Sequence, residues 1–484
     1  MQILMLTDQQ PDYLADSLYD GFARTTATII DYPNKLIYHR NPPSDDETGW
    51  IRGTWNNQPE HGLTREEIRE KLRGGAFSCM IVSSDRGEIP ELYQEFRAIS
   101  TCPLVLLDGR DQEDEIYPWI ADADLYLKRE LIEEVHYCRH LNFAFPDSPS
   151  PGRLEPVPGK VIADRKYDVS FVGNLWAGRD LLVKRLLNQG LEVYVASPLD
   201  SWSEYEEVLR ESKLVLNPHG FGHTNWRLFE ALNYGAVPIT ENTDRTHPEC
   251  TLWFDSDDMV QYVKSALQDL DALQLTRDRF YAEFRDSCLS SHSASKLIRL
   301  LRCLPLKHEF DRRVNTPTDI HQHLVALNRY ALKCRHVTEF GMRTGESTSA
   351  FLWAMPEKLV SYDLEPDRQQ IHHLKTLAQM CTQHFEFTQA NDLEIEIEKT
   401  DLLFIDTLHT AEQLRQELAI HAGKVGKFII MHDTAETTFG LTGENGGEGL
   451  LVAIHEFVEH NPRWEIAEQT EACNGLTVLA RRGV

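Results

Sequence analysis

Two aspartates near the end of the chain follow apolar segments that are typical of buried strands. Asp406 ends the segment LLFID, and Asp433 ends the segment FIIMHD. Parallel strands of one sheet end at the same edge, so both carboxylates are expected there, where such oxygen ligands suit Mg²⁺ or Mn²⁺. His409 lies three residues after Asp406, and histidine titrates near neutrality. A surface histidine at the start of a helix is one interpretation of it, and a functional residue at this edge is the other.

The segment EFGMRTGES lies upstream, after an expected strand at 336–340. Glycine lets a ligand approach the backbone at the N-terminus of the following helix. The next expected strand, 359–362, leads into Asp363, where a carboxylate can accept the hydroxyls of a ribose. An aspartate that caps a turn is the alternative for Asp363. A third expected strand is followed by QANDLE, which contains Asp392.

In this order, the motifs EFGMRTGES, SYDLE, QANDLE, DLLFIDTLH and KFIIMHDT resemble those of class I S-adenosylmethionine-dependent methyltransferases, in particular metal-assisted O-methyltransferases of small molecules and sugars. The resemblance covers residues 316–484. It implies S-adenosylmethionine as the cofactor, with its methionine part at the glycine loop, its ribose at Asp363 and its adenine near Asp392. The loop residues concerned are Glu339, Gly341 and Gly345.

The same resemblance implies a divalent cation, Mg²⁺ or Mn²⁺, held by Asp406 and Asp433, with His409 as the base. The family's third metal ligand directly follows the second carboxylate, and Thr434 stands there instead. This departure puts the metal in question. His432 is a candidate replacement ligand, and a histidine that belongs to the core is the alternative.

Two turn-rich segments complete this part of the chain. The glycine-rich segment 440–449 is interpreted either as a mobile lid over the donor or as an inert loop. The pair Asn474-Gly475 is typical of a turn before a closing antiparallel strand.

A second group of candidates lies in the segment 212–240, which predicts a strand, a glycine-containing loop, a helix and another strand. Arg227 and Glu230 are three residues apart, so both project from one face of the helix. An arginine can bind a diphosphate through two of its nitrogens, and a carboxylate can accept ribose hydroxyls. A solvated ion pair between the two side chains is the alternative.

This segment resembles the nucleotide-binding half of GT-B glycosyltransferases, especially the spore-maturation-like and exostosin-like groups. DVSFVGN at 168–174 and DYLADSLYDGF at 12–22 are similar to other parts of the same group. The resemblance implies a nucleotide-sugar donor. Many retaining members carry a second glutamate where Gly222 stands here. The acceptor-side base is expected from the first unit, with Asp8 as the candidate. The implied donor-binding residues are His219, Gly220, Asn225, Arg227 and Glu230.

Length and pattern predict an α/β architecture of three domains. The 484 residues alternate short apolar strands with helical segments, which favours parallel sheets. We expect two Rossmann-like units that form a GT-B cleft, followed by a third Rossmann-like methyltransferase domain. The predicted boundaries are 1–155, 156–310 and 316–484, with a proline-rich linker at 146–158 and a second seam at 303–317. A polar segment at 38–62, which contains Trp50 and Trp55, predicts a long loop.

Charge and cysteine content narrow the partners and the compartment. The 76 acidic residues exceed the 49 basic ones and give a net charge of −27, which disfavours nucleic acid as a partner. The nine cysteines form no Cys-x-x-Cys pair, and MQILMLTDQQ has no basic segment typical of a signal peptide. The sequence therefore predicts a cytoplasmic protein without a transmembrane segment.

Three functional hypotheses follow. The first is a bifunctional glycan-modifying enzyme, which transfers a sugar from a nucleotide donor and O-methylates a glycan or a small hydroxylated acceptor. The second is a methyltransferase whose GT-B-like module only binds or assembles glycans. In the third, the C-terminal unit performs a reaction other than methylation, because a fold does not determine its chemistry.

Overall fold

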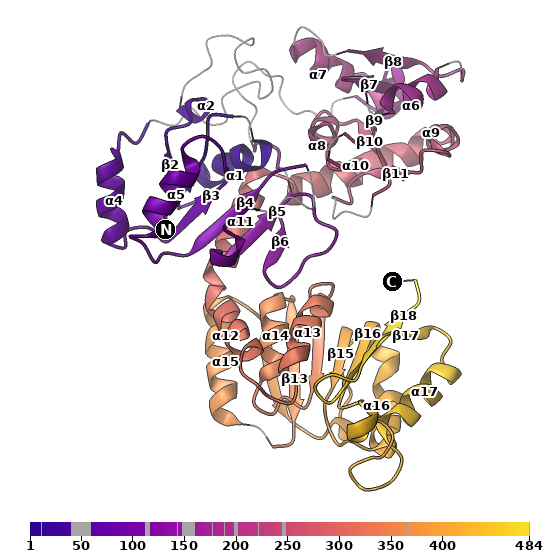
Figure 1. Ribbon diagram of the computed structural model, residues 1–484. Helices are drawn as coiled ribbons and strands as arrows, with labels where there is room; N and C mark the ends of the chain where they lie inside the picture. The colour runs from indigo at the N-terminus through magenta and orange to yellow at the C-terminus, as the bar shows by residue number, and fades with distance from the viewer. Residues whose placement is uncertain are drawn as a thin grey trace. The chain divides into compact units, whose positions relative to one another are not determined.

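The computed structural model divides the chain into two compact units, each with its own core (Figure 1). Unit 1 comprises residues 1–133 and 137–298, and unit 2 comprises residues 134–136 and 299–484. The expected loop with Trp50 and Trp55 and the linker at 146–158 fall largely outside the described residues. The structure describes residues 1–10, 12–39, 60–111, 117–142, 144–147, 160–176, 178–187, 189–197, 202–220, 222–243, 248–365 and 367–483.

The first sheet of unit 1 is parallel throughout, in the order β2-β1-β3-β4-β5-β6. Its central strands are continuous apolar runs such as CMIV and LVLLD, which suits a parallel sheet that is covered on both faces. The strands are β1 (Gln2–Leu6), β2 (Thr28–Tyr32), β3 (Cys79–Val82), β4 (Leu104–Asp108), β5 (Leu125–Lys128) and β6 (Cys138–His140). The helices are α1 (Tyr13–Ala23), α2 (Leu36–His39), α4 (Arg65–Arg73) and α5 (Ile89–Arg97).

The second sheet of unit 1 is also parallel, in the order β11-β10-β9-β7-β8. Its strands are β7 (Tyr167–Val172), β8 (Val193–Ala196), β9 (Ser212–Asn217), β10 (Val237–Glu241) and β11 (Leu252–Phe254). The helices of this part are α6 (Arg179–Leu186), α7 (Trp202–Arg210), α8 (Trp226–Asn233), α9 (Met259–Gln268), α10 (Leu270–Ser287) and α11 (Ser290–Arg302), the last of which ends in unit 2.

Unit 2 contains a seven-stranded sheet in the order β14-β13-β12-β15-β16-β18-β17. All neighbouring strands are parallel except β18, which pairs antiparallel with β16 and with β17. The strands are β12 (His336–Phe340), β13 (Lys358–Asp363), β14 (Phe385–Gln389), β15 (Thr400–Ile405), β16 (Val425–His432), β17 (Trp464–Thr470) and β18 (Leu476–Arg481). The turn expected at Asn474-Gly475 joins β17 to β18, with both residues at positive φ.

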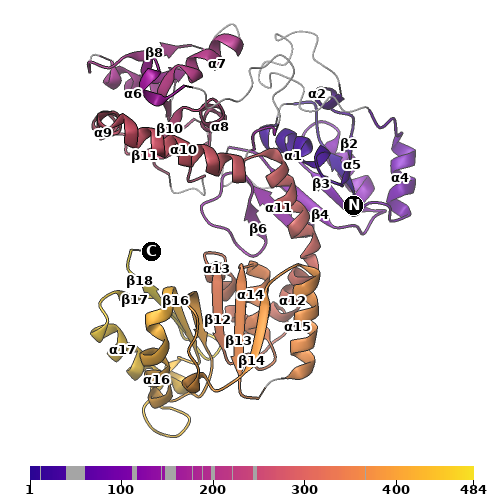
Figure 2. The ribbon, with the colours of Figure 1, turned by 180° about the vertical axis from the view of Figure 1, so that it is seen from behind.

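Helices α12, α13 and α14 of unit 2 pack on one another, as do α16 and α17. Figure 2 shows the strands β12, β13 and β14 beside α15. The helices are α12 (Leu304–Val314), α13 (Leu324–Ala331), α14 (Glu346–Ala354), α15 (Arg368–Met380), α16 (Ala411–His421) and α17 (Leu450–His460).

The predicted α/β fold class, with parallel Rossmann-like sheets, is confirmed. The helix α12 occupies most of the segment 303–317, which was predicted as the seam between the second and third domains. Pro305 lies in the first turn of this helix, where a missing N–H breaks no helical hydrogen bond. Leu306 and Phe310 are buried and hold the helix in the core.

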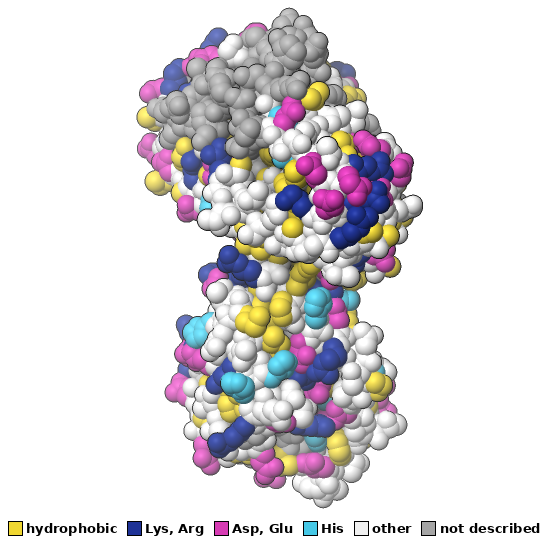
Figure 3. Space-filling view, turned by 90° about the vertical axis from the view of Figure 1, so that its left-hand side faces the viewer, with side chains coloured by type: hydrophobic (Ala, Val, Ile, Leu, Met, Phe, Trp, Pro, Cys, Tyr) yellow, Lys and Arg dark blue, Asp and Glu magenta, His cyan; other side chains and the backbone are white. Residues whose placement is uncertain are grey.

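Two properties of the described residues concern possible partners: the hydropathy of the helices and the charge on the surface. No helix among the described residues is long and apolar enough to cross a membrane. On the face drawn in Figure 3, acidic and basic side chains lie among one another. Local charge there is therefore mixed despite the acidic composition of the chain.

Gly341 provides a test of how tightly the unit 2 sheet is built. Its φ is +82°, and a Cβ there would lie 1.8 Å from the carbonyl oxygen of Asp406. We expect Gly341→Ala to destabilise the chain by about 3 kcal/mol or more, from left-handed strain plus the clash, and to lower the midpoint of thermal unfolding by several degrees. The control is Gly423→Ala, since a Cβ at Gly423 meets no atom within 4 Å. Equal midpoints for the two variants would contradict this packing.

Candidate functional site

The unit 2 sheet reverses its strand order beside β12, since β13 lies on one side of it and β15 on the other. Ligands of open α/β sheets bind beyond the carboxyl ends of the strands at such a point. Gly341 follows β12 and Asp406 follows β15, and the Asp406 amide donates to the carbonyl of Phe340 at 3.0 Å. The glycine loop and the first candidate metal ligand therefore begin at adjacent positions on this edge.

Glu339 lies beneath the glycine loop and is fully buried. It accepts hydrogen bonds from Ser347 at 2.5 Å, from Thr348 at 2.8 Å and from Ser361. Burial raises the pKa of Glu339 to about 7, although the three hydroxyls oppose the shift. The carboxylate thus joins β12, α14 and β13. The resemblance implied that it faces the methionine part of the cofactor, whereas these contacts make it a support of the loop.

Asp363, the expected ribose ligand, ends β13 and contacts the same loop. It accepts the Arg343 and Glu365 amides, both at 2.7 Å. Arg343 has φ 45°, so this bond stabilises a left-handed residue between the two loop glycines. Gly345, at φ +83°, has no room for a side chain because Leu374 lies 2.5 Å from its would-be Cβ.

Asp392, expected near adenine, is buried against α16. Its side chain accepts from Gln413 at 3.3 Å, and its carbonyl lies 2.8 Å from the ring of His421. Burial and the neighbouring Asp392 hold the pKa of Glu417 well above its usual range. The structure therefore places Asp392 in a buried polar group with α16.

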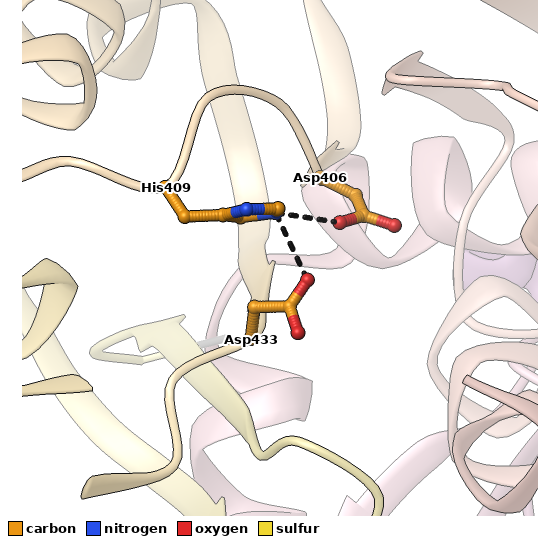
Figure 4. A group of neighbouring side chains, drawn as sticks. All are labelled: Asp406, His409 and Asp433. Atoms are coloured by element: carbon orange, nitrogen blue, oxygen red, sulfur yellow. Dashed lines mark ion pairs between the residues drawn. The ribbon is translucent and has the colours of Figure 1, made fainter. Parts of the chain in front are cut away.

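Asp406, His409 and Asp433 converge at the carboxyl ends of β15 and β16 (Figure 4). Nε2 of His409 lies 2.9 Å from Oδ2 of Asp433 and 3.6 Å from Oδ1 of Asp406. His409 precedes α16, whose N-cap is Thr410, so the start of the helix sets its position. Asp433 has φ 59°, a left-handed conformation that aspartate tolerates better than most residues.

The same cluster contains His432, for which the sequence left two interpretations open, a metal ligand and a core residue. Its Nδ1 lies 3.1 Å from Asp433 and 3.4 Å from Asp406. Burial opposes charge on both rings, but the hydrogen bonds and charges of the two aspartates raise the pKa of His409 and of His432 to about 10. The paired histidines hold the pKa of Asp433 below its usual range. In this form the cluster balances two imidazolium and two carboxylate charges.

Residues of the segment 436–449 contact His409, which the sequence did not indicate. Phe439 stacks on its ring with centroids 4.6 Å apart and planes 5° apart. Glu444 accepts from the His409 amide at 3.3 Å and donates its own amide to the His409 carbonyl at 3.1 Å. In this structure the glycine-rich segment is therefore packed against the cluster.

The second sheet of unit 1 reverses its order between β7 and β9, and Arg227 reaches this point from α8. Its Nη2 donates to the carbonyl of Val172 at 3.0 Å, and its guanidinium lies over the ring of Phe171. Nε and Nη1 of Arg227 are buried and have no hydrogen-bond partner among the described residues. A buried guanidinium with unused donors suits an anion such as a diphosphate.

Arg179, which the sequence analysis missed, lies beside Arg227. It begins α6, is buried, and donates to the carbonyl of His219 at 2.8 Å. Burial and the charge of Arg227 lower the pKa of Arg179 to about 10. A would-be Cβ on Gly220 lies 2.6 Å from Arg179, so glycine is what lets the loop approach the guanidinium. The signal that could have revealed it was the strand-turn-helix pattern around DVSFVGN.

Glu230 and Asn225 have different partners from Arg227. Glu230 is buried and accepts from the hydroxyl of Tyr205 at 2.7 Å. Asn225, the N-cap residue of α8, donates to the carbonyl of Pro218 at 2.8 Å. The structure therefore places His219, Gly220 and Asn225 in the loop before α8. Arg227 lies in the first turn of α8, and Glu230 lies one helical turn further along it.

Gly222 has a physical reason to be glycine. A Cβ there would lie 2.7 Å from Glu130, 2.8 Å from Asp111 and 2.9 Å from Arg129. Glu130 accepts the Thr224 amide at 3.1 Å, and Arg129 donates to the Thr224 carbonyl at 3.0 Å. Residues from the first sheet thus fill the position where a glutamate side chain would stand.

Asp8, the candidate acceptor-side base, follows β1 where the first sheet reverses its order. It accepts from the Ser84 hydroxyl at 2.7 Å and from the Gln10 amide at 2.8 Å. A second acid, Asp12, lies nearby as the N-cap of α1. Burial and the charge of Asp16 raise the pKa of Asp12 to about 6, which suits a base better than an ordinary aspartate does.

Comparisons with known proteins match parts of the chain. Residues 160–267 match the family model of the RXYLT1 C-terminal domain. No curated protein is significantly similar to the chain. Among solved structures, it is similar to the methyltransferase PaMTH1 of Podospora anserina bound to SAH, at 14% identity over 37% of this chain and 88% of that one, with a TM-score of 0.27.

It is also similar to an O-methyltransferase of Bacillus cereus in complex with SAH, at 16% identity over 38% of this chain and 91% of that one, with a TM-score of 0.27. The chain is likewise similar to a methyltransferase of Geobacter sulfurreducens, at 15% identity over 37% of this chain and 88% of that one, with a TM-score of 0.27. Similarities of this extent define neither a fold nor a function. The fold described above depends on strand order and pairing alone.

The pKa of Glu339 predicts a pH-dependent stability. Because the folded state raises this pKa from 4.5 to about 7, Glu339 stabilises the fold fully below pH 4.5, and this contribution is lost as the pH rises through 7. Glu339→Gln has no such loss. We therefore expect the stability of Glu339→Gln relative to the unsubstituted chain to rise by about 1–3 kcal/mol between pH 5 and pH 8. The measurement is the difference between the unfolding midpoints of the two proteins at each pH. Exposed Glu459→Gln should show no trend, and a pH-independent difference for Glu339→Gln would contradict the raised pKa.

Proposed function

We propose that the chain is a bifunctional glycan-modifying enzyme. Unit 1 transfers a sugar from a nucleotide donor in the manner of a GT-B glycosyltransferase, and unit 2 methylates a hydroxyl of a glycan or small acceptor with S-adenosylmethionine. The observation that carries the proposal is the position of the polar clusters. Asp406, His409 and Asp433 lie beside the glycine loop at the reversal point of one sheet, and Arg179 and Arg227 lie at that of another.

In unit 2, we assign donor binding to the glycine loop and to Asp363. Gly341 and Gly345 let the loop pack closely on Asp406 and Leu374, and Glu339 and Asp363 hold the loop in place. S-adenosylmethionine supplies a methyl group on a positively charged sulfur. The acceptor hydroxyl must lose its proton as its oxygen bonds to the methyl carbon and the carbon–sulfur bond breaks toward sulfur.

The Asp406–His409–Asp433 cluster is our candidate for the removal of that proton. It can act through His409 as a base once the ring has released the proton that the two aspartates stabilise, or through a cation that lowers the pKa of the hydroxyl. The fit to a cation is supported by Asp433, whose Oδ1 is buried without a hydrogen-bond partner among the described residues. Asp406, Asp433 and the histidines between them would hold the ion.

In unit 1, we assign the diphosphate of the nucleotide sugar to Arg227 and Arg179. The match of residues 160–267 to a xylosyltransferase-related family supports this use of the second sheet. The acceptor-side base is assigned to Asp8 or to Asp12 at the end of β1. We favour Asp12 because its pKa of about 6 leaves it a stronger base.

A second candidate function is a methyltransferase with a GT-B-like module that binds glycans without transferring sugar. Gly222 favours it, because the position of the second glutamate of retaining enzymes has no side chain, and the side chains of Glu130, Asp111 and Arg129 lie within 2.9 Å of a would-be Cβ there. Calorimetry on the whole chain distinguishes the bifunctional enzyme from this second candidate. Binding of S-adenosylmethionine and of one nucleotide among UDP, GDP, dTDP and CMP, without competition, supports the bifunctional enzyme. Binding of the methyl donor alone supports the second candidate, and no binding of the methyl donor overturns the methyltransferase assignment.

Arginine variants test the nucleotide site. Arg227→Gln and Arg179→Gln should each weaken binding of the preferred nucleoside diphosphate about 10-fold to 100-fold, because each loses a charged hydrogen bond to phosphate. Lys184→Gln, on the exposed side of α6, is the matched control and should bind as the unsubstituted chain does. Unchanged affinity in both arginine variants would exclude this position for the diphosphate.

Asp406→Asn tests the methyl-transfer site. We expect more than about a 100-fold loss of methyl transfer to an acceptor found by screening mono- and oligosaccharides with radiolabelled donor, because the cluster loses one charged group. Calorimetric binding of S-adenosylmethionine should stay within about threefold, since Asp406 supports the acceptor side. Glu412→Gln, an exposed residue on α16, serves as the control. Full activity in Asp406→Asn would remove the cluster from the mechanism.

A further inference from the structure

We infer that unit 2 has a second ligand site, away from the glycine loop, for a small anion that carries an aromatic or aliphatic body. The site is a cavity of about 670 Å³ between the ends of α16 and α17 and the strands β17 and β18. This volume is within the range of small-molecule sites, about 300–1,000 Å³. The described residues that line the cavity include none of the methyl-transfer cluster, so the inference goes beyond the proposed function.

The cavity lies at the edge of the sheet opposite the methyl-transfer cluster. Helix α16 begins beside that cluster and ends shortly before β16 begins, so its second half lies toward the amino ends of the parallel strands. Trp464, which begins β17, is aligned with Arg481, which ends β18. Because β18 runs antiparallel to β16, Arg481 lies level with the start of β16. A ligand here therefore leaves the carboxyl edge free for donor and acceptor.

Two helices turn one face each to the cavity. Helices α16 and α17 pack against each other and lie side by side in Figure 2. Their lining residues recur at i, i+3, i+4 and i+7, which is the spacing of a single helical face. These residues are Arg415, Leu418, Ala419 and Ala422 from α16 and the turn that follows it, and Ala453, Glu456, Phe457 and His460 from α17.

Short side chains leave the cavity hollow, and apolar groups line it. Ala422 and Ala453 are buried and belong to the core of unit 2, and a Cβ at Gly423 would meet no atom within 4 Å. Phe457 and Trp464 also line the cavity, with ring centroids 6.4 Å apart. Apolar surface of this kind favours an aromatic or aliphatic body, because contact removes apolar area from water.

Two arginines give the cavity its charge. Arg463 and Arg481 line it, and neither makes a side-chain ion pair with another described residue. Arg415, by contrast, is paired with Glu448 at 2.6 Å and with Glu456 at 2.7 Å. The ends of α16 and α17 add partial negative charge, equivalent to about half a charge each at most. Two unpaired guanidinium groups exceed this, so the cavity attracts an anion.

The lining defines the ligand class. A guanidinium binds a carboxylate, phosphate or sulfonate through two N–H groups, and small-molecule sites combine a few such polar contacts with mostly apolar walls. The chain as a whole has a net charge of −27, which repels anions at long range. Attraction at this cavity is therefore local, and the apolar body must contribute to affinity.

The test is binding of anilinonaphthalene sulfonate, a fluorescent aromatic anion, to the full chain. We expect saturable binding of one probe per chain, and at least about 10-fold weaker binding of phenylnaphthylamine, which has the same aromatic body without the sulfonate. Arg463→Gln and Arg481→Gln should each weaken sulfonate binding about 10-fold. Arg482→Gln is the matched control, because this neighbouring arginine pairs with Glu465 and does not line the cavity.

A second pair of variants tests the cavity itself. Ala419→Trp adds a large side chain at a lining position and should weaken binding more than about 10-fold. Gln416→Trp, at an exposed position of α16 that does not line the cavity, should leave binding unchanged. If Ala419→Trp fails to fold, the arginine variants still decide.

Three outcomes would overturn the inference. They are equal affinity for the charged and neutral probes, unchanged binding in both arginine variants, and displacement of the probe by S-adenosylmethionine or by a nucleoside diphosphate. The last would place the probe in a site of the proposed function. Failure of S-adenosylmethionine itself to bind would overturn the proposed methyl transfer and leave the probe result unaffected.

Discussion

The parallel pairing of β12 with β15 is the constraint on which the unit 2 site depends. Phe340 is aligned with Ile405 across the two strands, so the next residue of each strand emerges at the same level of the sheet. The backbones then approach so closely that only glycine fits at 341. A shift of this pairing by one residue would separate the glycine loop from Asp406 and would turn alternate side chains to the opposite face.

Unit 1 uses the same geometry with different chemistry. Arg179 from α6 and Arg227 from α8 bring guanidinium groups to the edge of its second sheet, whereas the edge of the unit 2 sheet carries two carboxylates paired with two histidines. In both sites the charged side chains lie where the backbone turns away from the sheet. In unit 1, Gly220 gives the guanidinium of Arg179 room to approach the backbone, and in unit 2, Gly341 lets two backbone segments approach each other.

The sequence predicted the sheets and most of the residues at their edges, because apolar strands followed by glycine or aspartate are local signals. Asp406 and Asp433 were predicted at one edge from the strand pattern, and His409 was added from the family resemblance; the structure brings the three together. Contacts that depend on distant segments could not be predicted in this way. The stacking of Phe439 on His409 and the filling of the Gly222 position by Glu130 each join segments far apart in the chain. The helix α12 lies in the segment that was interpreted as a domain seam, and its proline stands in the first turn, where it is compatible with a helix.

The two contacts on Thr224 have a consequence for the movement of the sheets within unit 1. Glu130 and Arg129, neighbours in the chain, hold the amide and the carbonyl of a single residue, so the two sheets cannot part there without losing both bonds together. Charge-assisted hydrogen bonds contribute about 1.5–3 kcal/mol each. At equilibrium, fewer than about one molecule in a hundred would then be open at this place. Any rearrangement that parts the sheets at this place would be an infrequent excursion of the free protein, which a ligand would have to stabilise.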